Sequence, residues 1–241
     1  EKGSLAVKLH FDEVKFDIPE AYQIIDGNKV AVKMAFSIKG DVATFRALGK
    51  VDNRYALVID PSVKWGTWFD CNSNTFDEYL FAVDLDNSGN VYCGGIANMQ
   101  LPAGTYAGQT FGYDATYNDA GTSGNGGNRD AILYKISSDG AQLLAVTYFG
   151  GSGLDGIYGL SLSPDKSTVF VCGYTSSNAT TFPLVNTPFD GTFNTGREGF
   201  VAAFSAPTLN ALNYSTYLGH TGAGDNMYTI HAINNTDFIV G

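Results

Sequence analysis

The sequence predicts an all-β protein: a small antiparallel β domain followed by part of a β-propeller built from four-stranded blades. Three observations lead to this fold class. Apolar and polar residues alternate in the first part of the chain, the composition changes at residue 64, and the second part repeats itself. With 241 residues, 13% aromatic and 16% charged, the chain is long and apolar enough to bury a core.

The composition divides the chain into two parts. Residues 1–64 carry 10 Lys and Arg against 9 Asp and Glu, whereas residues 65–241 carry 4 against 15. Only 4 of the 29 glycines precede residue 65. Such different compositions indicate two domains, so we predict that residues 1–64 are the C-terminal part of an antiparallel β domain.

Residues 1–64 read as a series of strands. Apolar residues occupy every second position in three stretches, a fourth and last stretch is continuously apolar, and Asp, Gly and Asn residues that favour turns lie between them. An apolar period of two excludes a helix, which needs a period of about 3.6. We therefore predict a twisted antiparallel sheet with one face in water. The four stretches are residues 5–11, 14–18, 30–38 and 55–59.

Residues 65–241 contain landmarks that recur in one order. The triplet Thr67-Trp68-Phe69 has counterparts at residues 147–149 and 216–218. Residues 91–95 match 170–174, which places Cys93 on Cys172. Residues 129–134 match 197–202. Three landmarks with nearly constant spacing indicate tandem units.

Each unit holds about four short strands, which in the middle unit are expected near residues 145–149, 157–162, 168–174 and 199–204. Tandem four-stranded units predict propeller blades, and a β-solenoid is the alternative fold. The predicted blades are residues 65–144, 145–212 and an incomplete 213–241. Because a ring needs about four to eight blades, we expect an open arc whose partner is the remainder of the same polypeptide.

Several strings of residues carry a resemblance to a known family. YSTYLGHTGAGDNMYTI (214–230), VTYFGGSGLDGIYGLSL (146–162), VDLDNSGNVYCGG (83–95) and residues 129–140 resemble the SBBP repeat, a seven-bladed propeller repeat of bacteria. Residues 16–36 and 55–69 resemble the end of the uncharacterised β domain that commonly precedes these repeats. The resemblance implies a large secreted protein on a bacterial surface, often in Bacteroidetes, where type IX secretion is frequent.

The residue types that carry out chemistry are few and scattered. The three histidines (His10, His220 and His231) share no spacing typical of a metal or catalytic site, and no catalytic motif is found. The sequence therefore predicts no catalytic residue, no metal and no cofactor. A net charge of −10 argues against nucleic acid and anionic lipid as partners, and no apolar run is long enough to span a membrane.

The three cysteines, Cys71, Cys93 and Cys172, cannot form a complete set of disulfides. We expect buried free thiols, with Cys93 and Cys172 at equivalent positions of neighbouring blades.

Two acidic patterns have structural and cation-binding interpretations. Residues 84–89 resemble the start of a calcium loop, but position 12 is Gly95 and not Glu, so a hairpin turn is favoured. Asp77, Asp155 and Asp225 follow the three Thr-aromatic landmarks at similar distances. We expect them to accept backbone N–H bonds, with a ring of carboxylates that holds cations as the alternative.

The loop from Gly104 to Asn128 is the candidate binding surface. It is long, rich in Gly, Thr and Asn, and lies between predicted strands, where function is often found. Because it is polar, we expect the fold to survive its deletion. The predicted ligand-binding residues are Tyr106, Phe111, Tyr113 and Tyr117.

Three functions fit these observations. The favoured one is a non-enzymatic structural or adhesion module, secreted or on the cell surface, that contacts a surface glycan or protein. The second is a glycan-binding propeller, which needs exposed aromatic residues beside Asp or Asn. The third is a polysaccharide-active enzyme, which needs a cluster of titratable side chains in its loops.

Overall fold

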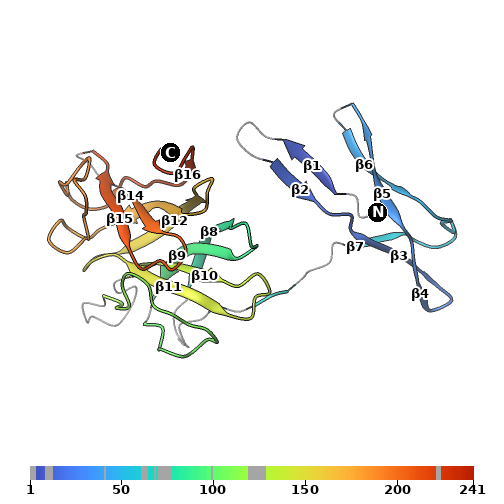
Figure 1. The fold of residues 1–241 in the computed structure, drawn as a ribbon, viewed down its shortest axis with the longest axis horizontal. Coiled ribbons are helices and arrows are strands. Elements are labelled where there is room, and N and C mark those ends of the chain that lie inside the picture. Colours follow the sequence, from blue (N-terminus) through green and yellow to red (C-terminus); the bar gives the residue numbers. More distant parts are fainter. Residues whose placement is uncertain are drawn as a thin grey trace. The chain divides into compact units, whose positions relative to one another are not determined.

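In a computed structural model, the fold is described for residues 4–8, 13–40, 42–60, 65–67, 69, 78–98, 100–118, 129–220 and 224–241. The prediction of an all-β fold is confirmed: every regular element in these residues is a strand, and all named strands pair antiparallel (Figure 1). The chain divides into two compact units, residues 1–64 and 65–241, at the position where the composition changes.

In its described residues, the first unit has seven short strands in three small sheets. A turn at Asp26 and Gly27, both with positive φ, joins β3 to β4, where the sequence predicts a hairpin. The two-stranded sheets are β1 (Leu5–Lys8) with β2 (Glu13–Phe16), and β5 (Met34–Lys39) with β6 (Val42–Ala47). The three-stranded sheet has the order β4 (Asn28–Ala31), β3 (Glu20–Ile25), β7 (Val58–Asp60).

The alternating run at residues 30–38 does not form one strand. It is interrupted at Val32 and Lys33, so β4 and β5 belong to different sheets. The N–H of Val32 donates to the carbonyl oxygen of Ala21 at 2.7 Å, and Val32 and Ala21 are both buried in the small core of this unit. Alternation predicts the strand type but not the break, because apolar residues continue through the bend.

Within the described part of the second unit, the strands form two four-stranded sheets and one two-stranded sheet. The first sheet is β8 (Tyr79–Leu85), β9 (Val91–Ala97), β10 (Asp130–Ile136) and β11 (Leu143–Phe149). The second sheet is β12 (Asp155–Leu162), β13 (Thr168–Thr175), β14 (Glu198–Ser205) and β15 (Leu212–Leu218). The third is β16 (Ile230–Ala232) with β17 (Phe238–Val240). In each sheet, strands consecutive in the chain are neighbours.

The sheets are offset by one strand from the repeat units seen in the sequence. Strand β11 stands at the start of the unit 145–212, yet it pairs with β10 in the first sheet. The reason is a tight hairpin, in which the N–H of Ser137 donates to the carbonyl oxygen of Gln142 at 3.0 Å. Each sequence unit thus begins with the last strand of one sheet and continues with three strands of the next.

The sheets of the second unit pack face to face, with large side chains between them. Phe149 and Leu133 of the first sheet, with Ile157, Val171 and Phe200 of the second, lie in one buried cluster. A further cluster joins the second sheet to β16, and it contains Phe170, Cys172 and Ile230. Because the second sheet is covered on both faces, its two central strands, β13 and β14, are buried along almost their whole length.

The register of the strands corrects the alignment of the cysteines. Gly95 and Gly173 are counterparts, since a Cβ on either would overlap a carbonyl oxygen of the neighbouring first strand. Cys172 therefore corresponds to Gly94, and Cys93 packs on the other face of its own sheet. The prediction that the two cysteines are equivalent is wrong by one residue, which in a strand reverses the face.

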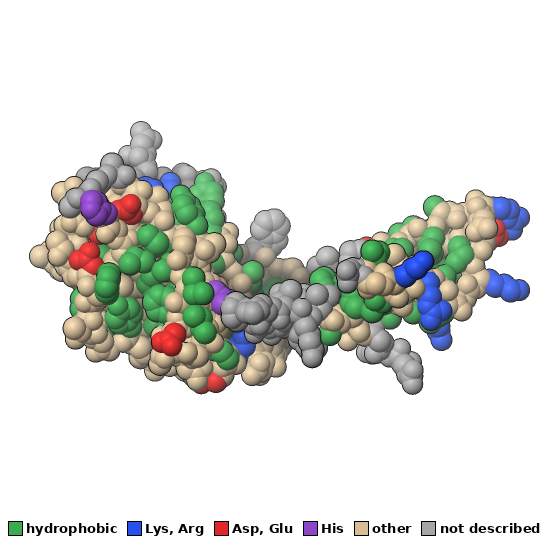
Figure 2. Space-filling model, turned by 90° about the horizontal axis from the view of Figure 1, so that it is seen from above, with side chains coloured by type: hydrophobic (Ala, Val, Ile, Leu, Met, Phe, Trp, Pro, Cys, Tyr) green, Lys and Arg blue, Asp and Glu red, His purple; other side chains and the backbone are tan. Residues whose placement is uncertain are grey.

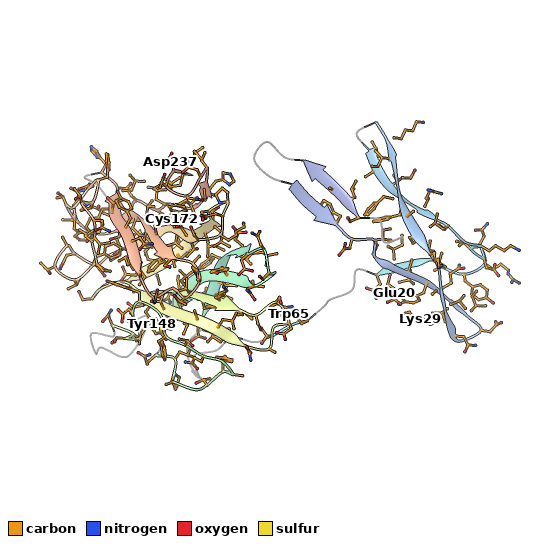
Figure 3. All side chains as sticks on the ribbon, in the orientation of Figure 1. Glu20, Lys29, Trp65, Tyr148, Cys172 and Asp237 are labelled. Atoms are coloured by element: carbon orange, nitrogen blue, oxygen red, sulfur yellow. The ribbon has the colours of Figure 1, made fainter. Side chains whose placement is uncertain are left out.

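Both of these cysteines are buried and free, as predicted, and Cys71 lies outside the described residues. Burial raises the pKa of the Cys93 thiol, and it raises that of Cys172 to about 12. Figure 3 labels Cys172 on its strand.

The two units also differ in surface charge. Figure 2 shows most of the visible Lys and Arg side chains on the first unit and most of the visible Asp and Glu on the second. This follows the excess of 11 acidic residues in residues 65–241.

Candidate functional site

The predicted binding loop lies against the outer strand of the first sheet. Its described part, residues 104–118, runs beside β11 and exchanges backbone hydrogen bonds with it. The N–H of Gly112 donates to the carbonyl oxygen of Val146 at 2.7 Å, and that of Tyr148 donates to Asp114 at 3.0 Å. Residues 119–128 of the loop lie outside the described residues.

The four aromatic residues of this loop do not form one exposed surface. Tyr106, Phe111 and Tyr117 are partly buried and pack on the apolar face of the first sheet. Tyr117 meets Tyr148 edge-on, with ring centroids 5.9 Å apart, and Tyr148 is labelled in Figure 3. Tyr113 is 39% exposed. Three of the four thus cover the sheet, and their ligand role stays a prediction.

The same loop structure occurs in the second sheet. Residues 113–118 (Tyr-Asp-Ala-Thr-Tyr-Asn) correspond to residues 189–194 (Phe-Asp-Gly-Thr-Phe-Asn). The N–H of Asp114 donates to Thr147 Oγ1 at 2.8 Å, and that of Asp190 donates to Thr216 Oγ1 at 2.9 Å. The sequence contains this correspondence, but the three landmarks of the repeat do not include it. It makes the loop part of the repeat.

A shallow pocket lies where the start of the second unit meets this loop. Phe69 stacks between Tyr106 and Tyr134, with centroids 5.6 and 4.2 Å away, and lines the pocket with the hairpin that joins β10 to β11. The indole N–H of Trp65 donates to the carbonyl oxygen of Ser138 at 2.8 Å. Both faces of the Phe69 ring are therefore covered by aromatic side chains of the protein itself.

The repeated aspartates have the structural role that the sequence predicts. Asp155 Oδ2 accepts the N–H of Gly151 and the hydroxyl of Ser177, both at 2.8 Å. Asp225 Oδ2 accepts the N–H of His220, also at 2.8 Å. The prediction is confirmed for these two residues, whereas Asp77 lies outside the described residues.

A second acidic side chain lies close to Asp155. Asp130, at the start of β10, is fully buried, and its Oδ1 is 2.9 Å from the position that a Cβ on Gly150 would take. The same position lies against Asp155 Oδ2. Burial raises the pKa of Asp155 to about 6. Among the described residues, no three His, Cys, Asp or Glu side chains come together as a metal site would require.

The stretch that resembles a calcium loop is a hairpin turn, as predicted. It joins β8 to β9, and Asp86 Oδ1 accepts the N–H groups of Ser88 and Asn90, each at 2.9 Å. Lys135 forms an ion pair with Asp86 Oδ2 at 3.1 Å. Asp86 is thereby held in the turn by three partners.

The structure reveals a row of aromatic rings that the sequence does not predict. Phe81 and Tyr158 are counterparts in the first strands of the two large sheets, and Tyr228 precedes β16 at the corresponding position. The centroids of Phe81 and Tyr158 are 5.1 Å apart, and those of Tyr158 and Tyr228 are 5.2 Å apart. Tyr79 extends the row, 6.1 Å from Phe81. We call these four residues the aromatic row.

The comparisons with known proteins concern the first unit. A family model described as a domain of unknown function (DUF7948) matches residues 1–62. This is the unit whose sequence resembles the β domain in front of SBBP repeats. No curated protein matches the chain. Within the described residues, no helix has the length and apolar character needed to cross a membrane.

Proposed function

We propose that the chain is part of a non-enzymatic structural or adhesion module, in which the four-stranded sheets are blades of a β-propeller that follows the first β domain. The module is extracellular or on a cell surface. Its partners are the remainder of the same polypeptide and a surface glycan or protein.

The observation that carries the proposal is the repeated way in which each sheet docks on the one before it. The N–H of Asp155 donates to the carbonyl oxygen of Arg129 at 2.6 Å, and that of Asp225 donates to Arg197 at 3.1 Å. A side chain of each first strand accepts the next bond: Asp84 Oδ2 from the N–H of Leu162 at 2.8 Å, and Ser161 Oγ from the N–H of Ala232 at 3.1 Å. Repetition of one docking step is how blades follow one another around an axis.

The exposed face of β8 supports further blades in the polypeptide. Three of its apolar side chains are 47% to 65% exposed, whereas their counterparts on β12 are 8% exposed or less. The counterparts on β12 are buried because the first sheet covers them. A further sheet of the same kind would cover β8 in the same way. The pairs are Leu80 with Ile157, Val83 with Leu160, and Leu85 with Leu162.

The use of the acidic side chains favours a structural role over catalysis. Asp155, Asp225 and Asp86 accept bonds that hold turns at the ends of strands. Catalytic groups usually converge on a cleft with perturbed pKa values and a free path to a substrate. The perturbed group Asp155 is fully buried instead.

The proposed location rests on the sequence resemblance. SBBP repeats that follow this type of β domain imply a secreted protein of a bacterial surface, often in Bacteroidetes, where type IX secretion is frequent. The acidity of residues 65–241 is consistent with a module that keeps away from anionic membranes and nucleic acid.

A screen with polysaccharides tests the proposal. The purified chain is incubated with soluble neutral and acidic polysaccharides, and both retention and the release of new sugar ends are measured. We expect retention on a glycan or protein surface without release of ends. Release of sugar ends that is lost in a folded Asp155→Asn variant would mean that the chain is an enzyme and not a structural module.

The glycan-binding propeller is the second candidate function. This function needs exposed aromatic residues, and three members of the aromatic row, Tyr79, Phe81 and Tyr228, are 41% to 59% exposed.

A further inference from the structure

We propose that the first described residues of the second unit, 65–67 and 69, belong to the outermost strand of the sheet that covers β8, and that the other three strands of that sheet come from elsewhere in the same polypeptide. We call these residues the leading segment. The inference rests on the proposed propeller and names the place at which its ring closes, by addition of a strand to the leading segment.

The sequence relates the leading segment to the last strands of the two large sheets. Residues 67–69 (Thr-Trp-Phe) correspond to residues 147–149 (Thr-Tyr-Phe) of β11 and 216–218 (Thr-Tyr-Leu) of β15. Strands β11 and β15 are each the fourth strand of a sheet, and the other three strands directly precede them in the chain. The leading segment instead follows the first unit, whose described strands form sheets of their own. Its three partner strands are therefore expected from another part of the polypeptide.

Phe69 contacts the first sheet in the way that Phe149 contacts the second. The ring of Phe149 is 4.9 Å from that of Phe182, measured between centroids, and the ring of Phe69 is 5.6 Å from that of Tyr106. Tyr106 and Phe182 are counterparts, because each lies seven residues before the loop segment that the two sheets share. Phe69 thus takes the place against the first sheet that the last strand of a preceding sheet takes against the second.

Only part of this face of the first sheet is covered in the described residues. Val83, Cys93 and Tyr134 are paired in one row across β8, β9 and β10, so their side chains point to the same face. Phe69 stacks on Tyr134 at 4.2 Å, whereas Val83 at the other end of the row is 65% exposed. The corresponding row of the second sheet is buried throughout, and it consists of Leu160, Val171 and Ala202. One outermost strand thus covers one end of the row, and three further strands would cover the rest.

The leading segment is anchored at both ends and exposed between them. The indole N–H of Trp65 donates to the carbonyl oxygen of Ser138 at 2.8 Å (Figure 3), and Phe69 is partly buried on the first sheet. Gly66 and Thr67 are exposed, and among the described residues neither lies in a strand or shares a backbone hydrogen bond. An extended segment that is fixed in place with its backbone exposed accepts a further strand.

The register of the large sheets specifies the strand that is added. Thr147 pairs with Leu133 of β10, and Thr216 pairs with Val201 of β14. In both cases the partner lies three residues after the acidic residue that begins the third strand. The added strand is therefore antiparallel, begins with an acidic residue and places an apolar side chain opposite Thr67.

The neighbours of β11 show which edge of the leading segment receives the strand. The N–H groups of Val146 and Tyr148 donate to the loop beside β11, so the N–H of Thr147 between them faces β10. By correspondence, the N–H of Thr67 faces the added strand and that of Gly66 faces the opposite side. Proline at position 67 removes a donor that the added strand needs, whereas proline at position 66 does not.

Fluorescence titration of the full chain with a strand peptide tests the addition. Both tryptophans of the chain, Trp65 and Trp68, lie at the leading segment, so their emission reports on it. The probe is a synthetic peptide that copies residues 196–206, which contain β14 and no tryptophan. We expect a saturable change in emission with a Kd of about 1 mM or lower, and a Thr67→Pro variant that binds at least about tenfold more weakly.

Gly66→Pro is the matched control, and we expect it to change the affinity less than about twofold. Thermal unfolding of both variants shows that the fold is retained. The inference is wrong if the peptide gives no saturable change with the folded wild-type chain at millimolar concentration, or if the two proline variants weaken binding equally. Either result leaves the structural module in place with its ring closed in another way, whereas release of sugar ends in the screen above would overturn the module itself.

Discussion

The carboxyl group of Asp155 lies fully buried at the start of β12. Its Oδ2 accepts two hydrogen bonds, while its Oδ1 has no hydrogen-bond partner among the described residues. Desolvation raises its pKa from 3.8 to about 6. A carboxyl group with a raised folded-state pKa stabilises the fold at low pH, and this contribution is lost as the pH rises toward 6.

Replacement of this charge tests the argument. In Asp155→Asn the amide oxygen still accepts the N–H of Gly151, and no charge has to be buried. We expect the variant to be more stable than the wild type near neutral pH, by at most about 3 kcal/mol, and to gain much less near pH 4. Urea unfolding at both pH values measures the difference.

The control for this substitution is Asp139→Asn. Asp139 is exposed, and hydrogen bonds from Ser137 and Ala141 hold its pKa below the ordinary value, so it does not titrate in the same interval. An unchanged pH dependence in Asp155→Asn would contradict the assignment.

Gly173 illustrates how a single residue permits a bulge. A Cβ at this position would overlap the carbonyl oxygen of Gly156, which is backbone and has little room to move. We expect Gly173→Ala to destabilise the second unit by about 2–4 kcal/mol, measured by urea unfolding. Gly191→Ala is the matched control, because its counterpart in the first sheet is Ala115 and its Cβ would make an ordinary 3.5 Å contact with Pro188. Equal effects of the two substitutions would refute the overlap.

At the scale of elements, the loop after β9 behaves as part of the sheet that it covers. The sequence predicts that residues 104–128 are dispensable, but the described part carries Phe111, which bridges to Val146 and packs on the buried face. The polar composition of the loop suggests that the fold does not depend on it, because Gly, Thr and Asn far outnumber the few aromatic residues that anchor it to the sheet.

Substitutions in this loop show whether it is dispensable or is a packed part of the sheet. We expect Tyr117→Ala to lower the free energy of unfolding by about 1–3 kcal/mol, since Tyr117 packs against Tyr148. Tyr113→Ala is the comparison, because Tyr113 is more exposed, and its expected cost is about 0.5 kcal/mol. Denaturant unfolding measures both. A loop that is truly dispensable would give equal, small effects.

Sequence patterns reveal the elements better than the way they join. Alternation in residues 1–64 and the repeats after residue 65 predict the strand type and the tandem order. The sequence does not predict which four strands share a sheet, because the residues of β11 look the same whether the strand begins a repeat unit or ends a sheet. The sequence does not predict the aromatic row either. Phe81 and Tyr158 do not stand out in the sequence, and only the pairing of the strands shows that each is the extra residue of a β-bulge.

For the whole molecule, the main question is what lies against β8. Its exposed apolar residues, Leu80, Val83 and Leu85, are counterparts of residues that a neighbouring sheet buries on β12. An uncovered apolar strand at a sheet edge also favours association of chains. The surface of this unit is therefore consistent with a structure that continues beyond two large sheets.

A pair of equivalent substitutions tests this continuation. Val83 is 65% exposed and its counterpart Leu160 is 8% exposed, so a serine at each position removes the same kind of contact from two different environments. In this chain we expect Val83→Ser to change the free energy of unfolding by about 0.5 kcal/mol and Leu160→Ser to lower it by about 3 kcal/mol. Val83→Ser should also reduce any self-association seen by sedimentation, because it makes the exposed strand polar. In a polypeptide long enough to close the ring, the cost of Val83→Ser should rise to that of Leu160→Ser, since the same type of sheet would then cover both. A cost that stays small in the longer polypeptide would mean that no sheet docks on β8, and the propeller proposal would be wrong.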